Sequence, residues 1–461
     1  MIATAGTCPV QTTQQSLWFE TALLPEGWAQ DVRIDVAGGR IVGVEAGAAK
    51  MGEAAGSVAL PGVANVHSHA FQRAMAGLTE ARGPTDDDFW TWRELMYRFL
   101  DRGGPDEIEA ITALAFAEML EGGFTRVAEF HYLHNDTAGA AYGDRGEIAG
   151  RIAAAAEQTG IALTLLPVFY AQSGFGGAAP SHGQRRFIND LDGFAELVGR
   201  CRDVTAPLAD AVVGVAPHSL RAVTPEALAA MPGLTDGPIH IHVAEQTKEV
   251  DDCLAWSGAR PVEWLLANAS VDARWTLIHS THATEAEWRG VVERQAVVGL
   301  CPITEANLGD GVFPAAAYAK AGGRIGIGTD SNVQIGLAEE LRMLEYSQRL
   351  ALRGRAVIAD GGRSTGRALF DRALAGGAQA GGVEAAIAVG APADIVALDT
   401  RGSVFAGRSG DAVLDSWIFG APTGSVASVW RAGKQVVRDG RHIDRPAIEA
   451  RYRRALATVL G

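Results

Sequence analysis

Apolar, strand-like segments alternate with helical segments rich in alanine, leucine and glutamate from about residue 60 to residue 385. Such short apolar runs, bounded by turn residues, predict buried strands. They cover residues 63–66, 126–130, 163–168, 212–216, 239–243, 276–279, 297–301 and 324–328. Strands that alternate with helices pair in parallel, and eight such units close into a barrel. We therefore expect an α/β fold with a (β/α)8 TIM-like barrel.

Both ends of the chain have a different pattern. Residues 31–36 alternate between apolar and polar, Gly38-Gly39 provides a turn, and residues 40–44 form an answering strand, as in a β-hairpin. The same strand and hairpin pattern occurs again at residues 393–399, 425–430 and 435–438. We therefore expect a small β-sandwich domain built from both chain ends. The expected division is 1–60 for its N-terminal part, 61–385 for the metal-dependent barrel, and 386–461 for its C-terminal part with a terminal helix.

Composition and charge exclude several classes of protein. The chain has 461 residues and a net charge of −14, which argues against nucleic acid as the main partner because phosphate binding needs a basic surface. We see no signal segment and no run of about 18 apolar residues, so we expect no membrane partner. Four widely spaced cysteines exclude a disulfide framework and a thiolate zinc site, which favours a cytoplasmic protein with reduced thiols. Residues 1–15 are polar, and we expect them to be loosely ordered.

Candidate metal ligands fall where the predicted strands end. His67 and His69 follow the first barrel strand, and alternate side chains of an extended segment point the same way. Such a pair alone is weak evidence, but His242 and Asp330 follow later strands, whose carboxyl ends share one rim of a barrel. Neutral imidazoles with a carboxylate suit zinc and leave an open position for water. Fe²⁺ or Mn²⁺ would also fit this set of ligands.

Two further residues at this rim suit proton transfer. Glu245 comes three residues after His242, where it can move a proton of an activated water, although a glutamate in isolation is more often a surface residue. His279 ends a later strand and can help to deprotonate that water. His240 reads as a core histidine, and His282, in the following loop, reads as structural.

The lysine distribution indicates one metal ion rather than two. Binuclear relatives of this architecture bridge their ions with a carboxylated lysine at the end of a strand in the middle of the barrel. The sequence has no lysine between Lys50 and Lys248. A single metal follows, unless a carboxylate replaces the lysine.

These motifs resemble the amidohydrolase superfamily, in its single-metal deaminase branch. The resemblance rests on His67-Ser68-His69 after Leu60-Pro61-Gly62, on the later ligands, and on the return to a β-domain near residue 393. Longer runs resemble the formimidoylglutamate deiminases of bacterial histidine degradation, at residues 67–75, 89–94, 129–132, 218–225 and 304–311. The activity that the resemblance implies is zinc-dependent hydrolysis of N-formimidoyl-L-glutamate to N-formyl-L-glutamate and ammonia.

The resemblance also implies roles for individual residues. One zinc ion per subunit of a homodimer would be held by His67, His69, His242 and Asp330. Catalysis would fall to Glu245, His279 and Asp330. The substrate would be bound by Gln72, Arg93, Tyr132, His218 and Arg221. Arginine binds carboxylates in a planar, bidentate way, which suits a small-molecule substrate with two carboxylates. Asn332 stands where a histidine would also have been expected.

Two other functions remain open from the sequence. A mononuclear zinc deaminase of a cyclic amidine, such as guanine, would use the same metal ligands but would not need two arginines. A catalytically dead scaffold of the same fold would be expected to lack metal ligands, and here all are present.

Overall fold

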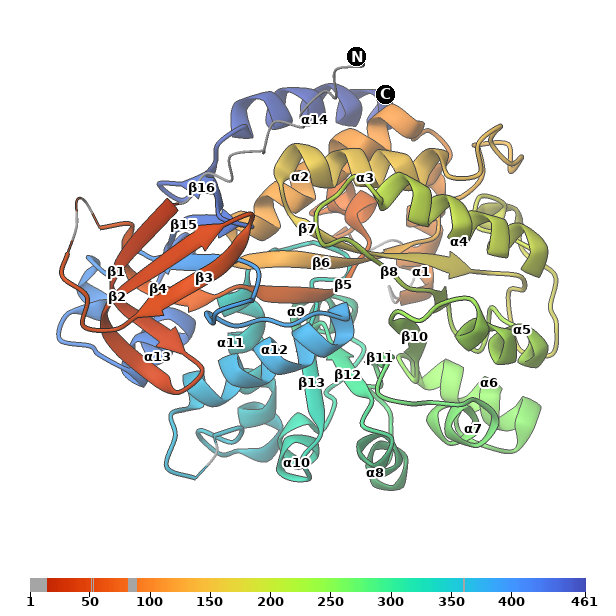
Figure 1. The fold of residues 1–461 in the computed structure, drawn as a ribbon. Coiled ribbons are helices and arrows are strands. Elements are labelled where there is room, and N and C mark those ends of the chain that lie inside the picture. Colours follow the sequence, from red (N-terminus) through yellow and green to blue (C-terminus); the bar gives the residue numbers. More distant parts are fainter. Residues whose placement is uncertain (1–14, 51, 53, 82–88, 360) are drawn as a thin grey trace, which may run out of the picture.

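The largest part of the molecule is a barrel of parallel strands surrounded by helices (Figure 1). The computed structural model describes residues 15–50, 52, 54–81, 89–359 and 361–461. Within them the barrel strands run in the order β10-β11-β12-β13-β5-β6-β7-β8, with β9 beside β7. They are β5 (Val63–Ser68), β6 (Phe124–His131), β7 (Ala162–Phe169), β8 (Val212–Val213), β9 (Ala216–Pro217), β10 (Ile239–Val243), β11 (Trp275–His279), β12 (Val297–Leu300) and β13 (Arg324–Ile327). The predicted barrel is confirmed, with one predicted strand divided into β8 and β9.

Isolated parallel bridges complete the barrel where the longer strands do not pair. They join Val215 to Ile239, Ser219 to His242, and Ser68 to Asp330. Because the strands are parallel, all their carboxyl ends lie at the same rim. The last two bridges lie at that rim, so they bring the chain around His67, His242 and Asp330 together.

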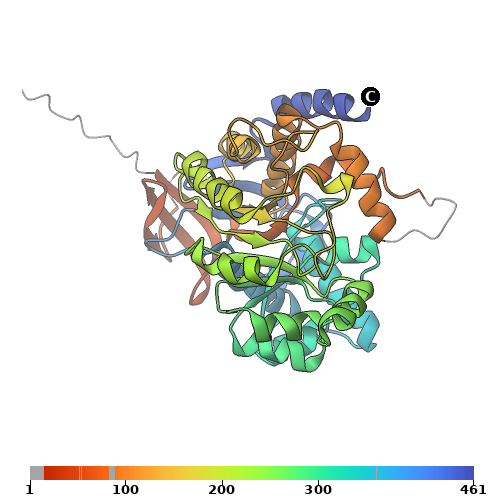
Figure 2. The same cartoon turned by 90° about the vertical axis from the view of Figure 1, so that its right-hand side faces the viewer.

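Helices surround the barrel in both views (Figures 1 and 2). They are α1 (Phe89–Leu100), α2 (Pro105–Glu121), α3 (Glu147–Thr159), α4 (Leu191–Thr205), α5 (Pro225–Ala230), α6 (Thr247–Ser257), α7 (Pro261–Asn268), α8 (Glu285–Glu293), α9 (Pro302–Leu308), α10 (Ala315–Lys320), α11 (Leu337–Leu352) and α12 (Thr365–Gly381). Several begin at residues whose side chains accept a hydrogen bond from the first turn, as N-caps do, namely Asp190, Thr224, Thr284 and Ser364. These caps fix where α4, α5, α8 and α12 start after their loops.

The first and last parts of the described chain form one further sheet beside the barrel (Figure 1). Its order is β17-β16-β15-β14-β4-β1-β2-β3, antiparallel except between β1 and β4. The strands are β1 (Gln15–Leu24), β2 (Gly27–Ala37), β3 (Arg40–Glu45), β4 (Gly56–Pro61), β14 (Ile395–Leu398), β15 (Val426–Arg431), β16 (Lys434–Arg438) and β17 (Arg441–His442). The small β-domain expected from both chain ends is thereby confirmed, and all its strands join in one hydrogen-bonded order.

Two further helices lie in the last part of the chain, α13 (Asp411–Phe419) and the terminal helix α14 (Arg445–Leu460). Arg445 of α14 forms ion pairs with Glu118 and Glu121 of α2, so the terminal helix lies on the barrel, as both views show (Figures 1 and 2). The division of the chain at residues 60 and 385 stays a prediction.

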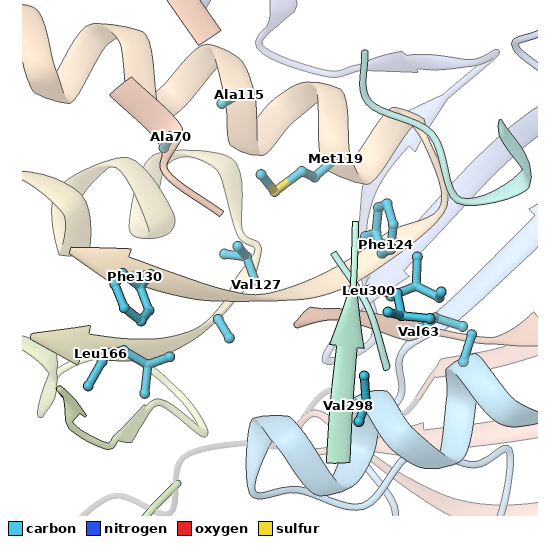
Figure 3. Close-up of a cluster of buried hydrophobic side chains, with 14 of the residues drawn as sticks. Val63, Ala70, Ala115, Met119, Phe124, Val127, Phe130, Leu166, Val298 and Leu300 are labelled. Carbon is cyan, nitrogen blue, oxygen red and sulfur yellow. The ribbon is translucent and has the colours of Figure 1, made fainter. Parts of the chain in front are cut away.

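The barrel strands are buried on both faces. Every residue of β5, β6 and β7 is buried, and Figure 3 shows Met119 of α2 packed over the side chains of β6. Strands covered on both faces are expected to be almost continuously apolar. Polar residues in such strands therefore need a reason, and at the carboxyl ends of β5 and β6 they are His67, Ser68, Glu129 and His131.

The cysteines, the N-terminal segment and the absence of membrane helices are further expectations from the sequence. Cys201, Cys253 and Cys301 are free and buried, so the described part of the chain contains no disulfide. Cys8 and the expected loose order of the N-terminal segment lie outside the described residues. No helix among the described residues is long and apolar enough to cross a membrane.

Candidate active site

Four side chains expected to bind metal meet at the carboxyl rim of the barrel. His67 and His69 come from the end of β5, His242 from β10, and Asp330 from the loop after β13. One ligand atom from each lies within 4.8 Å of all the others, and all four residues are buried. The Nε2 atoms of His67 and His242 are 3.0 Å apart, and Asp330 Oδ1 lies 3.3 Å from His69 Nε2.

The hydrogen bonds behind the cluster show that its donor set fits a cation. The Nδ1 atoms of His69 and His242 lie 3.0 Å from the carbonyl oxygens of Phe130 and His218. A carbonyl accepts only, so each Nδ1 carries the proton and each Nε2 presents a lone pair to the cluster. Burial lowers the pKa of His67 to about 3, which keeps that ring neutral as well. Neutral imidazoles, two of them with Nε2 lone pairs directed inward, and a carboxylate that converge at one point form a donor set that fits a metal ion.

Glu245, His279 and Glu305 form a second group next to these ligands. His279 Nε2 lies 3.8 Å from Glu245 Oε1 and 3.7 Å from Asp330 Oδ2. On the opposite side of the ring, His279 Nδ1 lies 3.2 Å from Glu305 Oε1. Burial raises the pKa of Glu245 to about 7. Burial lowers the pKa of His279, but the carboxylates of Glu245, Glu305 and Asp330 together raise it. The pair can therefore hold and exchange a proton near neutral pH.

The backbone at this rim is held in unusual conformations. His279, Ser280, Asp330 and Asn332 have φ values of 66°, 51°, 47° and 57°, in the left-handed region that non-glycine residues rarely occupy. Such strain clusters at functional sites, where the surrounding structure holds it. Here it turns the His279 and Asp330 side chains toward the cluster.

A pocket opens onto the cluster. Its lining includes all five residues expected to bind substrate, Gln72, Arg93, Tyr132, His218 and Arg221. Four buried polar atoms of pocket-lining residues have no hydrogen-bond partner among the described residues: Gln72 Oε1, Arg93 Nε, Arg221 Nε and His279 Nε2. Buried polar groups are nearly always paired, so these atoms indicate a polar ligand.

Gln72 and Arg221 are held in place by neighbouring side chains and still have hydrogen-bonding atoms for a ligand. Gln72 Nε2 donates to the Tyr132 hydroxyl at 2.8 Å, which leaves the Gln72 carbonyl oxygen as an acceptor. Arg221 lies 3.9 Å from both Glu245 and Glu249, too far for hydrogen bonds. Its guanidinium is therefore held near the acidic residues and still has donors to offer.

The remaining residues singled out in the sequence lie outside this group. His240 points away and pairs with the Ala380 carbonyl at 2.9 Å, as a core histidine does. The backbone N–H of His282 donates to Ala244 O in the turn after β10. Asn332 donates to Ser68 Oγ at 3.1 Å and so links the β5 and β13 ends. Lys248 is exposed and paired with Asp252, so it is no bridging ligand.

Three buried carboxylates support the site, although no sequence pattern assigns them a role. Glu249 of α6 accepts from the backbone N–H groups of Ala244 and Glu245, at 3.2 Å each, and so holds the turn that carries Glu245. Glu129 Oε1 accepts from Ala70 N at 2.7 Å, directly after the His67-Ser68-His69 motif. Glu305 Oε1 lies 3.2 Å from His279 Nδ1. No spacing rule connects these residues to the ligands, because they reach them through packing across different elements.

Comparisons with known proteins agree with this architecture. The model of the amidohydrolase family matches residues 58–436, and a model described as the N-terminal domain of formimidoylglutamate deiminase HutF matches residues 15–55. The chain is 51% identical over 454 residues to formimidoylglutamate deiminase of Pseudomonas aeruginosa, covering 97% of this chain and 99% of that protein.

Two solved structures are similar over almost the whole chain. An amidohydrolase from Brucella melitensis has 52% identity and a TM-score of 0.93, covering 97% of this chain and 100% of that one. An adenosine deaminase from Xanthomonas campestris with bound zinc has 25% identity and a TM-score of 0.80, covering 96% and 98%. With a family model spanning the barrel and a relative matching nearly end to end, the chain belongs to the amidohydrolase family.

Proposed function

We propose that this protein hydrolyses N-formimidoyl-L-glutamate to N-formyl-L-glutamate and ammonia. The observation that carries the proposal is one pocket, in which the Nε atoms of Arg93 and Arg221 have no hydrogen-bond partner among the described residues. In the same pocket Glu245 and His279 lie beside a buried ligand cluster. The substrate has two carboxylates and one formimidoyl group, which these residues complement. The 51% identity to a formimidoylglutamate deiminase supports the same reaction.

We assign one divalent metal, zinc, to His67, His69, His242 and Asp330. When bound there, zinc would lower the pKa of a water molecule toward neutrality and polarise the formimidoyl group. The zinc bound to the related adenosine deaminase supports this choice of metal. Fe²⁺ and Mn²⁺ are the alternatives to be tested against it.

The side chains of the pocket then bind and orient the substrate. Arg93 and Arg221 each donate to a carboxylate. Gln72 Oε1, which is buried without a partner among the described residues, accepts an N–H of the formimidoyl group. Tyr132 and His218 complete the walls of the pocket around it.

Proton transfer falls to Glu245 and His279. Glu245 Oε1 takes a proton from the attacking water as the bond between the water oxygen and the formimidoyl carbon forms. The same carboxyl delivers that proton to the imino nitrogen. His279 Nε2, 3.8 Å from Glu245 Oε1, orients the water together with Asp330. The remaining proton of the added water then passes to the terminal nitrogen, the carbon–oxygen double bond forms as the carbon–nitrogen bond to that nitrogen breaks, and ammonia leaves. The glutamate nitrogen keeps the formyl group.

The test combines substrates with a variant that spares the metal. The wild-type enzyme should release ammonia from formimidoylglutamate much faster than from formimidoylaspartate or guanine. Glu245→Gln should retain the metal by elemental analysis and lose turnover by orders of magnitude. Near-normal turnover in that variant would rule out the proton shuttle, and faster release from guanine would favour a deaminase of cyclic amidines.

The biological setting follows from the same proposal. A formimidoylglutamate deiminase acts in histidine degradation, as a cytoplasmic enzyme, and we propose a homodimer for this chain. Gel filtration with light scattering measures the oligomeric state directly, and a monomer would contradict that part.

A further inference from the structure

Two tyrosines and a glutamine lie together in the wall of the pocket, outside the set of residues assigned so far. Tyr97 comes from α1, Tyr170 directly follows β7, and Gln184 lies in the loop between β7 and α4. All three are buried, and both tyrosines line the pocket. Gln184 Nε2 donates to the Tyr170 hydroxyl at 2.6 Å.

The backbone fixes which way the Gln184 amide points. The backbone N–H of Ser181 donates to Gln184 Oε1 at 2.7 Å, so the amide oxygen faces the loop and the NH₂ group faces the tyrosines. The Tyr170 oxygen is therefore an acceptor toward Gln184, and its own O–H remains to be donated. Tyr97 lines the same part of the pocket, and at least the Tyr170 O–H is left for a ligand.

Both arginines of the pocket lie near these hydroxyls. The Cζ atoms of Arg93 and Arg221 lie 4.6 and 5.8 Å from the centre of the same Trp90 ring, and Arg93 Cζ lies 5.7 Å from that of Tyr97. Burial raises the pKa of Tyr170, against the opposing charges of Arg221 and Arg93, so its hydroxyl stays protonated. Cations and hydroxyl donors with few acceptors suit a carboxylate.

Ring contacts place this group at the end of the pocket away from the metal ligands. The Tyr132 ring lies 4.9 Å from that of the ligand His69. The Tyr170 ring instead contacts His218 at 4.7 Å, and His218 in turn lies 5.0 Å from the ligand His242. Tyr170 is therefore separated from the ligands by one further ring. In the substrate, the side-chain carboxylate is five bonds from the reacting carbon, and the α-carboxylate is three.

We propose that the hydroxyls of Tyr97 and Tyr170, oriented by Gln184, form with Arg93 the subsite for the side-chain carboxylate of the substrate. Arg221, 3.9 Å from Glu245, then binds the α-carboxylate nearer the reacting carbon. This inference rests on the proposed function and adds the residues that determine its specificity. It makes the protein selective for a five-carbon dicarboxylate backbone rather than for any formimidoyl amino acid.

The first part of the test removes the donors one at a time. Tyr97→Phe and Tyr170→Phe delete a hydroxyl, and Gln184→Glu keeps the shape but replaces the donating NH₂ with a negative oxygen. Each should lower kcat/KM for formimidoylglutamate about 10-fold or more, mainly through KM, since hydrogen bonds to charged groups are strong. Tyr318→Phe is the matched control, because it removes a buried tyrosine hydroxyl elsewhere in the barrel and should change nothing.

The second part shows which carboxylate is involved. On N-formimidoyl-L-norvaline, which has a methyl group in place of the side-chain carboxylate, the variants should match the wild type. On N-formimidoyl-4-aminobutyrate, which lacks the α-carboxylate, the full penalty should remain. Equal penalties on both analogues, or none on formimidoylglutamate, would overturn the inference and leave the proposed function intact. A wild-type enzyme that releases no ammonia from formimidoylglutamate would instead reject the proposed function. Should a phenylalanine variant fail to fold, kcat/KM of the near-isosteric Gln184→Glu variant on the same substrates tests the inference.

Discussion

The Nδ1 atom of His279 lies 3.2 Å from Glu305 Oε1, and both side chains are buried. The same oxygen accepts the backbone N–H of Cys301 at 2.9 Å, which fixes the carboxylate. Glu305 thereby keeps the proton of His279 on Nδ1 and directs Nε2 toward Glu245. This is a positioning role, of the kind that carboxylates play behind functional histidines.

Removing this carboxylate should slow turnover without weakening substrate binding. We expect Glu305→Ala to lower kcat about 10- to 100-fold with little change in KM, because the His279 ring loses its orientation. Steady-state ammonia release measures both constants. Glu293→Ala, at an exposed glutamate of α8, is the control and should be neutral. An unchanged kcat in Glu305→Ala would show that packing alone orients His279.

The ligand cluster predicts that the metal also stabilises the fold. The rings of three histidines and the Asp330 carboxylate converge in one buried space, where an ion would join them. Dialysis against a chelator should abolish ammonia release and lower the melting temperature, and zinc should restore both. An ion present at 1,000 times its Kd stabilises the folded state by about 4 kcal/mol. His242→Asn should reproduce the loss of metal, whereas the exposed His182→Asn should not. A melting temperature that is the same with and without the chelator would contradict a metal at this cluster.

Much of the barrel and of the ligand cluster could be predicted from the sequence, for a physical reason. Strands buried on both faces must be apolar, so polar residues directly after them stand out, and parallel strands bring those residues to one rim. His67, His242, His279 and Asp330 all follow this rule. Glu245 needed only one further step, its place three residues beyond His242.

The residues that sequence reasoning missed obey no such rule. Glu249 and Glu305 lie on helices and reach the site through hydrogen bonds to loops and side chains of other elements. Tyr97, Tyr170 and Gln184 come from three separate parts of the chain and meet only through packing. A buried tyrosine is also ordinary core material, so no composition or spacing marks it as part of a pocket.

Gly183 should be required for the position of Tyr97. A Cβ atom at residue 183 would lie 2.5 Å from Cδ2 and 2.7 Å from Cγ of the Tyr97 ring, closer than atoms can pack. Gly183→Ala must therefore move the ring or the loop that carries Gln184, and we expect KM to rise several-fold. Gly199→Ala is the matched control, because nothing lies within 4 Å of its Cβ and it sits in α4, where alanine favours helix by up to about 1 kcal/mol. A wild-type KM in Gly183→Ala would mean that the loop adjusts without disturbing the pocket.

The burial of His134 should cause the protein to lose stability as the pH falls into the mildly acidic range. Burial lowers the pKa of His134 from its ordinary 6.5 to about 4, while Nε2 pairs with Val168 O at 2.8 Å. Below the unfolded pKa of 6.5 the unfolded chain binds this proton and the folded chain does not. The contribution of His134 to the free energy of unfolding is therefore complete above pH 6.5, decreases between that pH and about pH 4, and stays constant below it. Between about pH 7 and pH 5 the loss amounts to about 2 kcal/mol.

His134→Gln isolates this contribution from those of the other buried histidines. Glutamine can still donate to Val168 O but does not titrate. The variant should be less stable than the wild type at about pH 7 and should lose less stability down to about pH 5. Unfolding by urea at each pH measures both slopes. Parallel curves for the two proteins would show that His134 does not titrate in this range.

Asp210 should hold the barrel and the second sheet together. Its carboxylate pairs with Arg126 of β6 at 2.9 Å and with Arg431 at the end of β15, which also pairs with Asp394 at 2.6 Å. Both guanidinium side chains are only 4% exposed, so removing the shared carboxylate leaves buried charge uncompensated. Asp210→Asn suits the test, because residue 210 has a φ of 54°, which asparagine tolerates, so only the charge is lost. We expect a loss of about 3–5 kcal/mol in the free energy of unfolding.

Because the network lies at the amino ends of the strands, opposite the pocket, kcat of Asp210→Asn should stay unchanged. Asp203→Ala breaks an exposed ion pair with Arg200 and should cost at most about 1 kcal/mol. Equal stabilities for the two variants would show that this network does not fasten the sheet to the barrel.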